Sequence, residues 1–125
     1  MSEIYQSEQT EDKPAVNFNL NSGVLEIEGK SLPENASDFY NPIIEWVSNY
    51  VKQPNKSTNL VCKIDYFNSS SARKFYDIFK ELEKIKDSGN NVKITWYHDP
   101  EDKLMETKGR EFQSVVKIPF DIQTM

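Results

Sequence analysis

Reactive side chains are most concentrated in the run Asn68-Ser69-Ser70-Ser71, where three hydroxyl groups follow one amide. An alternating apolar segment ends at this run, and a segment of helical periodicity begins in it. The simplest role is capping, because Asn and Ser side chains accept hydrogen bonds from the free amides of a first helical turn. One cap needs one side chain, so surplus hydroxyls remain for a kinase, and a phosphate there would meet the positive end of the helix dipole. The residues alone favour capping over a phosphorylation switch.

Other residue types that could do chemistry are scarce. His98 is the only histidine, which excludes a multi-histidine metal site within one chain. The acids that follow it, from Asp99 to Glu106, match no calcium-binding template and are interpreted as a solvated loop. Cys62, the only cysteine, is interpreted as a small core residue. The sequence also has no glycine-rich phosphate loop or nucleophile elbow, so we predict a protein that is not an enzyme and needs no metal or cofactor.

Length and charge restrict the class of protein. The chain has 125 residues, the length of one ordinary domain, and 37% of them are hydrophobic, enough for a core. The balance of 15 basic and 20 acidic residues argues against binding to nucleic acid. No apolar stretch approaches the roughly 18–20 residues that span a bilayer, and residues 1–8 carry acids where a signal peptide carries basic and apolar residues. We therefore expect a cytoplasmic protein that binds neither nucleic acid nor a membrane.

The first part of the chain differs from the rest in charge. Residues 1–14 hold four acids and one lysine, which is −3 of the net charge of −5. We expect residues 1–14 to form a flexible acidic tail, followed by one domain over residues 15–125.

Hydrophobic periodicity predicts eight elements in the order ββαβαβαβ. A hairpin is predicted over residues 16–28, helices over 37–52, 69–87 and 101–112, and strands over 58–67, 92–98 and 119–123. In the strand over 58–67, strict alternation places Ile64 and Tyr66 on one face, and Asp65 and Phe67 on the other. Charged residues at alternate positions leave one face of the sheet wet. We therefore predict an α/β fold with a mixed sheet of four to five strands and helices mainly on one face.

Several segments resemble one family of proteins. The segment 64–71, Ile64-Asp65-Tyr66-Phe67-Asn68-Ser69-Ser70-Ser71, resembles the Y-[FL]-N-[ST]-S-S junction of the SiaC family of bacterial regulatory phosphoproteins. The segment 29–35, Gly29-Lys30-Ser31-Leu32-Pro33-Glu34-Asn35, is similar to the family's G-x-S-x-P-E-N entry to its first helix. Phe39 through Trp46, then Trp96-Tyr97-His98-Asp99, then Pro119-Phe120 follow in the family's order. The resemblance covers residues 23–124.

The resemblance implies a fold and a pathway. The fold would be STAS-like, as in anti-sigma factor antagonists, which agrees with the one-sided sheet predicted from the residues. The pathway would be a phosphorylation cycle run by a histidine-kinase-like Ser/Thr kinase and a PPM-type phosphatase, with an unmodified form that binds and activates a GGDEF-type diguanylate cyclase. By position, Ser69 corresponds to the family's phosphorylated Ser or Thr.

A phosphate on Ser69 is expected to change binding more than folding. It adds about −1.5 to −2 charges at neutral pH, whereas its interaction with the helix contributes only about 0.3–1 kcal/mol. A partner that buries this turn would have to desolvate the phosphate, which weakens binding. The candidate partner-binding residues are Asn68, Ser70 and Arg73 at the junction and, as the weaker group, Pro33, Glu34 and Asn35, because Pro-Glu-Asn is also an ordinary helix entry.

Two other functions stay open at this stage. A STAS-like domain that binds a small ligand, such as a nucleotide or a lipid, would gain thermal stability from that ligand without needing Ser69. A passive scaffold would bind its partner equally well in both phosphorylation states.

Overall fold

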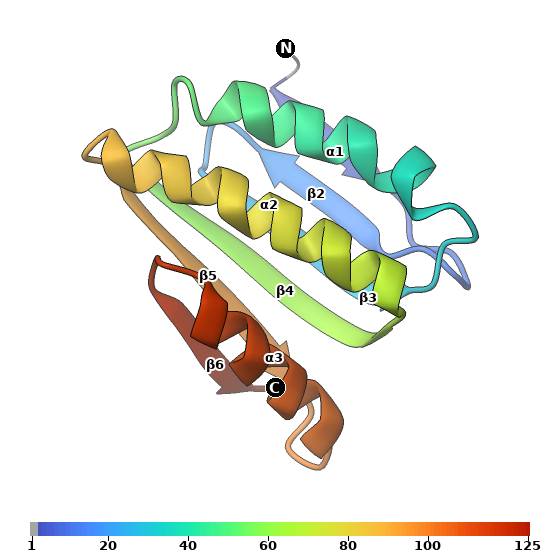
Figure 1. Cartoon of the computed structure of the whole chain (residues 1–125). Helices are drawn as coiled ribbons and strands as arrows, with labels where there is room; N and C mark the ends of the chain where they lie inside the picture. The colour runs from blue at the N-terminus through green and yellow to red at the C-terminus, as the bar shows by residue number, and fades with distance from the viewer. Residues whose placement is uncertain (1–2) are drawn as a thin grey trace.

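The computed structural model describes residues 3–125, which form six strands and three helices (Figure 1). The elements are β1 (Ile4–Ser7), β2 (Ala15–Asn19), β3 (Val24–Ser31), α1 (Ala36–Tyr50), β4 (Ser57–Phe67), α2 (Ser69–Asp87), β5 (Asn91–His98), α3 (Lys103–Val115) and β6 (Phe120–Thr124). The eight predicted elements are all present in the predicted order, and β1 is additional.

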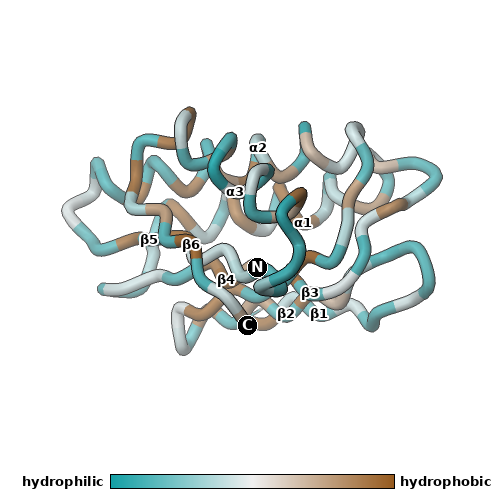
Figure 2. Tube along the Cα trace, turned by 90° about the horizontal axis from the view of Figure 1, so that it is seen from below, coloured by the Kyte–Doolittle hydropathy of each residue, from teal (hydrophilic) through white to brown (hydrophobic). Residues whose placement is uncertain are grey.

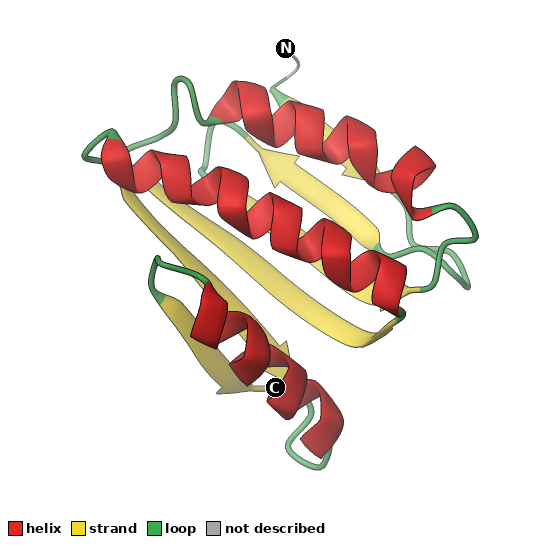
Figure 3. Cartoon of the chain, viewed as in Figure 1, coloured by secondary structure: helices red, strands yellow, loops and turns green. Residues whose placement is uncertain are grey.

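The six strands form one mixed sheet in the order β1-β2-β3-β4-β5-β6. The first two pairings are antiparallel and the last three are parallel. All three helices cover the same face of this sheet (Figures 2 and 3). The predicted mixed α/β sheet with helices on one face is therefore confirmed, whereas the STAS-like ordering stays a prediction.

The predicted number of strands is wrong, because the sheet has six. The extra strand lies within residues 1–14, the segment expected to be a flexible acidic tail; residues 4–7 are instead paired with β2, and residues 1–2 lie outside the described part. Tyr5 packs against the core, and the amide of Leu32 donates to the carbonyl of Asp12 at 2.8 Å. A strand of four residues with one aromatic side chain towards the core is too short to show a recognisable alternation of apolar and polar residues. Its conformation is decided by pairing with β2.

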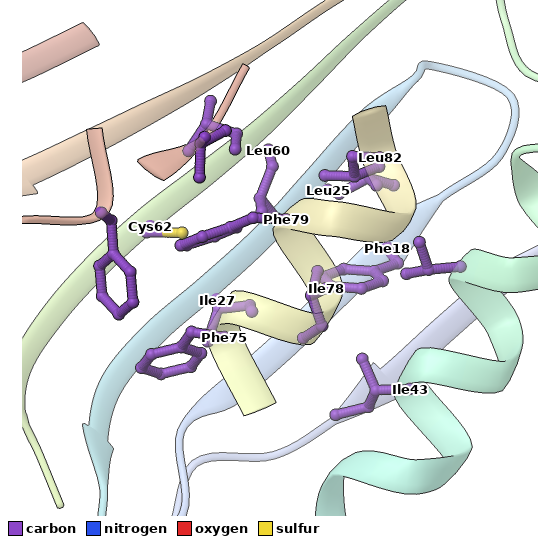
Figure 4. Packing of buried hydrophobic residues seen from close by; sticks show 14 of the residues in the cluster. Phe18, Leu25, Ile27, Ile43, Leu60, Cys62, Phe75, Ile78, Phe79 and Leu82 are labelled. Atoms are coloured by element: carbon purple, nitrogen blue, oxygen red, sulfur yellow. The ribbon is translucent and has the colours of Figure 1, made fainter. Parts of the chain in front are cut away.

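The core lies between the sheet and the helices, as the packed side chains of Figure 4 show. Buried residues of α2 recur at intervals of three and four, which places them on one helical face. They are Phe75, Ile78, Phe79, Leu82 and Ile85. On the sheet side, the core contains Phe18, Leu25, Ile27, Leu60 and Cys62 from the strands. Cys62 is a buried free thiol, as predicted, and burial raises its pKa.

A β-bulge near the end of β4 overturns the predicted faces of Tyr66 and Phe67. Ile64 pairs with Gly29 and Tyr66 pairs with Lys30, so the intervening Asp65 has no partner in β3. The extra residue shifts the alternation. Phe67 consequently turns into the core, where it is 7% exposed, and Tyr66 turns outwards and is 46% exposed.

Candidate switch site at the start of helix α2

The candidate site lies at the edge of the sheet where the parallel strands β3 and β4 both end. Strand β3 ends at Ser31 and β4 ends at Phe67, directly before α2. The amide of Asn68 donates to the carbonyl of Ser31 at 3.1 Å, which holds the two strand ends together. The junction before α2 and the loop before α1 are therefore neighbours, which the sequence left open.

Asn68 is the N-cap of α2. Its side-chain oxygen Oδ1 accepts from the amide of Ser71 at 2.9 Å and from the hydroxyl of Ser70 at 3.1 Å. Its carbonyl accepts from the amide of Ala72 at 3.0 Å. One Asn thus fulfils the capping role, and none of the three serines is needed as the cap.

The three serine hydroxyls have different environments. Ser71 is fully buried and donates to the carbonyl of Ser31 at 3.0 Å. Ser70 is exposed, but its hydroxyl donates to Asn68. Ser69 is exposed, and within residues 3–125 its hydroxyl makes no hydrogen bond. Ser69 therefore offers the most accessible hydroxyl of this turn.

A buried chain of hydroxyl groups supports the turn from below. Ser31 Oγ donates to Ser71 Oγ at 2.8 Å, so the short contact between Ser31 Oγ and Tyr40 Oη leaves the tyrosine as donor. The chain closes where Ser71 donates back to the carbonyl of Ser31. Burial raises the pKa of Tyr40, which keeps the phenol neutral. This chain joins α1, β3 and α2 with every buried polar atom paired.

Ser31 and Tyr40 are positioning residues that the sequence analysis did not select. Ser31 lies in the segment 29–35 and Ser71 lies in the junction, so both belong to the quoted motifs. Ser31 ends β3, whereas Ser71 is the third residue of α2 and Tyr40 lies in α1, so no sequence pattern links these three hydroxyls.

Arg73 lies one turn after Ser69 and its side chain is 73% exposed. Its Nε is 3.2 Å from Asp77 Oδ1, and its guanidinium lies 5.6 Å from the centre of the Tyr76 ring. Side chains four residues apart on a helix are neighbours, so Arg73 is within reach of a group attached to Ser69 as well as of Asp77.

The loop before α1 resembles the junction before α2. Asn35 is the N-cap of α1, and its Oδ1 accepts from the amide of Asp38 at 3.2 Å. Glu34 and Asn35 are exposed, whereas Pro33 is buried. Of the three candidate contacts in this loop, only Glu34 and Asn35 therefore offer side chains to a partner.

Acidic residues flank the junction on both sides. Two shallow pockets at this edge of the sheet contain most of them: Asp12, Glu34 and Asp38 line one, and Asp65, Asp99, Glu101 and Asp102 line the other. His98 next to the second pocket is buried, and its Nδ1 lies 2.8 Å from the carbonyl oxygen of Asp99. No group of His, Cys, Asp and Glu in the described residues could hold a metal ion. An acidic edge is unfavourable for an anionic ligand such as a nucleotide.

Fold and junction together define a small α/β domain with a capped helix start that presents a serine hydroxyl at one end of its sheet. The chain also matches the family model described as SiaC family regulatory phosphoprotein over residues 7–125. The chain therefore belongs to the SiaC family of regulatory phosphoproteins.

Solved structures of Pseudomonas aeruginosa SiaC are similar to the chain over nearly its whole length. Apo-SiaC is 28% identical with a TM-score of 0.90, and the match covers 98% of this chain and 99% of that one. A chain in the crystal structure of the diguanylate cyclase SiaD in complex with its activator SiaC is 26% identical with a TM-score of 0.91, over 97% and 99% of the two chains. An uncharacterised protein of Pseudomonas aeruginosa strain UCBPP-PA14 is 28% identical over 114 residues, 91% of this chain and 90% of that protein.

Residues 3–125 contain three helices. None of them is long and apolar enough to span a membrane.

Proposed function

We propose that this chain is a non-enzymatic regulator whose phosphorylation at Ser69 controls its binding to a GGDEF-type diguanylate cyclase. The observation that supports the partner class is the similarity to SiaC, which is described as the activator of the diguanylate cyclase SiaD. The observation that supports the residue is that Ser69 alone among the three junction serines is exposed and has a hydroxyl that makes no hydrogen bond within residues 3–125.

The proposed switch acts through the surface and leaves the fold unchanged. Phosphorylation leaves the Asn68 cap and the buried bonds of Ser71 intact, because neither involves the Ser69 hydroxyl. It adds about −1.5 to −2 charges and a bulky hydrated group to the exposed turn. A partner that packs against this turn must desolvate that group, so binding weakens while the domain stays folded.

The proposal includes the enzymes of the cycle and its location. A histidine-kinase-like Ser/Thr kinase adds the phosphate and a PPM-type phosphatase removes it, both acting on the accessible Ser69. The proposed partner contacts are Asn68, Ser70 and Arg73 next to Ser69, together with Glu34 and Asn35 in the loop after β3, whose last residue is bonded to Asn68; the buried Pro33 shapes that loop. The cycle runs in the cytoplasm.

The test is the affinity of four purified forms for a GGDEF-type diguanylate cyclase of the same organism. The forms are the unmodified chain, the chain with phosphoserine incorporated at position 69, Ser69→Ala and Ser70→Ala. We expect Ser69→Ala to bind like the unmodified chain, Ser70→Ala to lose only the small contribution of one exposed contact and stay within about threefold, and the phosphorylated form to bind at least about tenfold more weakly. Equal affinity of all four folded forms would leave a scaffold, and absence of binding by all four would reject the partner class.

A further inference from the structure

Tyr66 is the one exposed aromatic residue among residues 3–125. It is 46% exposed, whereas every other Phe, Tyr and Trp of this part of the chain is half-buried or buried. Its phenol hydroxyl makes no hydrogen bond within the same residues. No ring contact among these residues involves Tyr66 either, so its side chain is available to a partner.

The exposure of Tyr66 is a consequence of the bulge in β4. Regular alternation after Ile64 would place Tyr66 beneath the helices and Phe67 on the open face of the sheet. The unpaired Asp65 reverses the two, so that Phe67 packs against Phe75 at 5.3 Å between ring centres. Opposite the bulge, Gly29 has φ +116°, a conformation that side-chain-bearing residues rarely adopt. The backbone is thus shaped to present Tyr66 to the outside, as bulges near functional sites do.

Tyr66 is also close to the proposed switch. Three peptide units separate it from Ser69, so the two Cα atoms are at most about 11 Å apart. A standard interface covers about 800 Å² on each partner, which corresponds to a patch of about 16 Å in radius. The Cα atom of Tyr66 therefore lies within that radius of Ser69.

We propose that Tyr66 is an aromatic anchor of the interface with the diguanylate cyclase, inserted into an apolar pocket of that partner. This inference rests on the proposed function, because the occupant is the same partner that covers Ser69. Tyrosine is enriched among the residues that dominate binding energy, since its ring buries a large area at low entropic cost and its hydroxyl tolerates a wet rim. Lys30, paired with Tyr66 across the bulge, and Asp65 beside it provide the charged rim.

The two residues have separate roles under this proposal. Tyr66 provides affinity in the unmodified state, and Ser69 determines whether the partner can approach. Tyr66 takes no part in the hydrogen bonds of the Asn68 cap or of the buried hydroxyl chain, so we expect its replacement to leave the helix start unchanged.

The experiment compares Tyr66→Ala and Tyr66→Phe with a matched control. Val24→Ala is the control, because Val24 is 41% exposed and lies at the opposite end of β3, near the other edge of the sheet. The probe is a purified GGDEF-type diguanylate cyclase of the same organism, titrated with each variant. We expect Tyr66→Ala to raise the Kd by about tenfold or more, and Tyr66→Phe and Val24→Ala to stay within about threefold of the original chain. Melting temperatures should agree within about 2 °C, as expected for exposed positions.

The phosphoserine-69 form of the original chain is measured in the same series. If phosphorylation weakens binding and Tyr66→Ala binds normally, the anchor is rejected and the switch stands. If Tyr66→Ala weakens binding and phosphorylation does not, the anchor stands and the switch is rejected. An equal loss in Val24→Ala, or a loss accompanied by a lower melting temperature, overturns the anchor. If the unmodified chain does not bind the cyclase, both are rejected.

Discussion

Ser71→Ala and Ser70→Ala differ only in where the removed hydroxyl lies, which makes them a sharp test of the site geometry. Both serines belong to the first turn of α2, so the gain in helix propensity is similar and cancels in the comparison. Ser71 Oγ donates one buried hydrogen bond at 3.0 Å and accepts another at 2.8 Å, whereas Ser70 donates one exposed bond at 3.1 Å. The buried variant should therefore lose much more stability.

The expected loss follows from those bonds. Removing a buried hydroxyl costs about 1–3 kcal/mol of unfolding free energy, because its hydrogen bonds are lost and a buried partner is left unpaired. Here the partner is the Ser31 hydroxyl, which loses the oxygen to which it donates. An unfolding entropy of about 2.1 cal/mol/K per residue gives roughly 0.26 kcal/mol/K for this chain, so the melting temperature should fall by about 4–12 °C. Ser70→Ala should change stability by less than about 0.5 kcal/mol, or about 2 °C.

The assay is thermal unfolding followed by far-ultraviolet circular dichroism, with urea unfolding as a second measurement of the free energy. A double-mutant cycle with Tyr40→Phe adds a direct test, since coupled members of one chain should deviate from additivity by at least about 0.5 kcal/mol. Equal losses for the two serine variants, or full additivity with Tyr40→Phe, would refute the buried hydroxyl chain as the support of the turn.

Two further predictions concern other parts of the molecule. Gly109→Ala should destabilise the domain by about 1–3 kcal/mol despite the better helix propensity, because an added Cβ would lie 2.5 Å from Cδ1 of the buried Trp96 ring. Chemical denaturation tests this, with Arg110→Ala, a variant of the exposed neighbouring residue, as the control. An unchanged denaturation midpoint for Gly109→Ala would contradict the prediction. In the phosphoserine-69 form, Arg73 should leave Asp77 for the phosphate, since a negative group four residues before a positive one is the favourable order on a helix. Arg73→Gln should therefore raise the second pKa of the phosphate above that of the form with Arg73, in ³¹P NMR titrations; identical titration curves would exclude the exchange.

Long elements with a regular pattern of apolar residues could be predicted from the sequence. The helix beginning at Ser69 shows apolar residues at regular spacing from Phe75 to Ile85, and its bounds are the predicted ones, residues 69–87. Strand β1 could not be predicted, because its four residues gain their stability from pairing with β2 rather than from their own pattern.

The register between β3 and β4 at the bulge could not be predicted from the sequence either. The bulge at Asp65 is defined by the pairing of Tyr66 with Lys30, a contact between distant parts of the chain. An alternating pattern in one strand carries no information about such an extra residue, so the faces of Tyr66 and Phe67 were predicted in reverse.

The candidate site was predicted in part. Capping by the run Asn68 to Ser71 followed from residue type and position, and the structure identifies Asn68 as the cap. The different environments of the three serines depend on Ser31 and Tyr40, which reach Ser71 only through the fold. Sequence alone therefore located the turn, whereas the structure separates the free hydroxyl of Ser69 from the structural hydroxyl of Ser71.

The most direct test of the central claim is the rate at which the diguanylate cyclase forms its product in the presence of each form of the chain. The measurement compares the unmodified chain, the phosphoserine-69 form and Ser69→Ala at equal concentrations, after circular dichroism has shown that all three are folded. We expect the unmodified chain and Ser69→Ala to raise the rate and the phosphorylated form to leave it at the level of the cyclase alone. Equal stimulation by all three forms, or stimulation by none, would contradict the phosphoswitch.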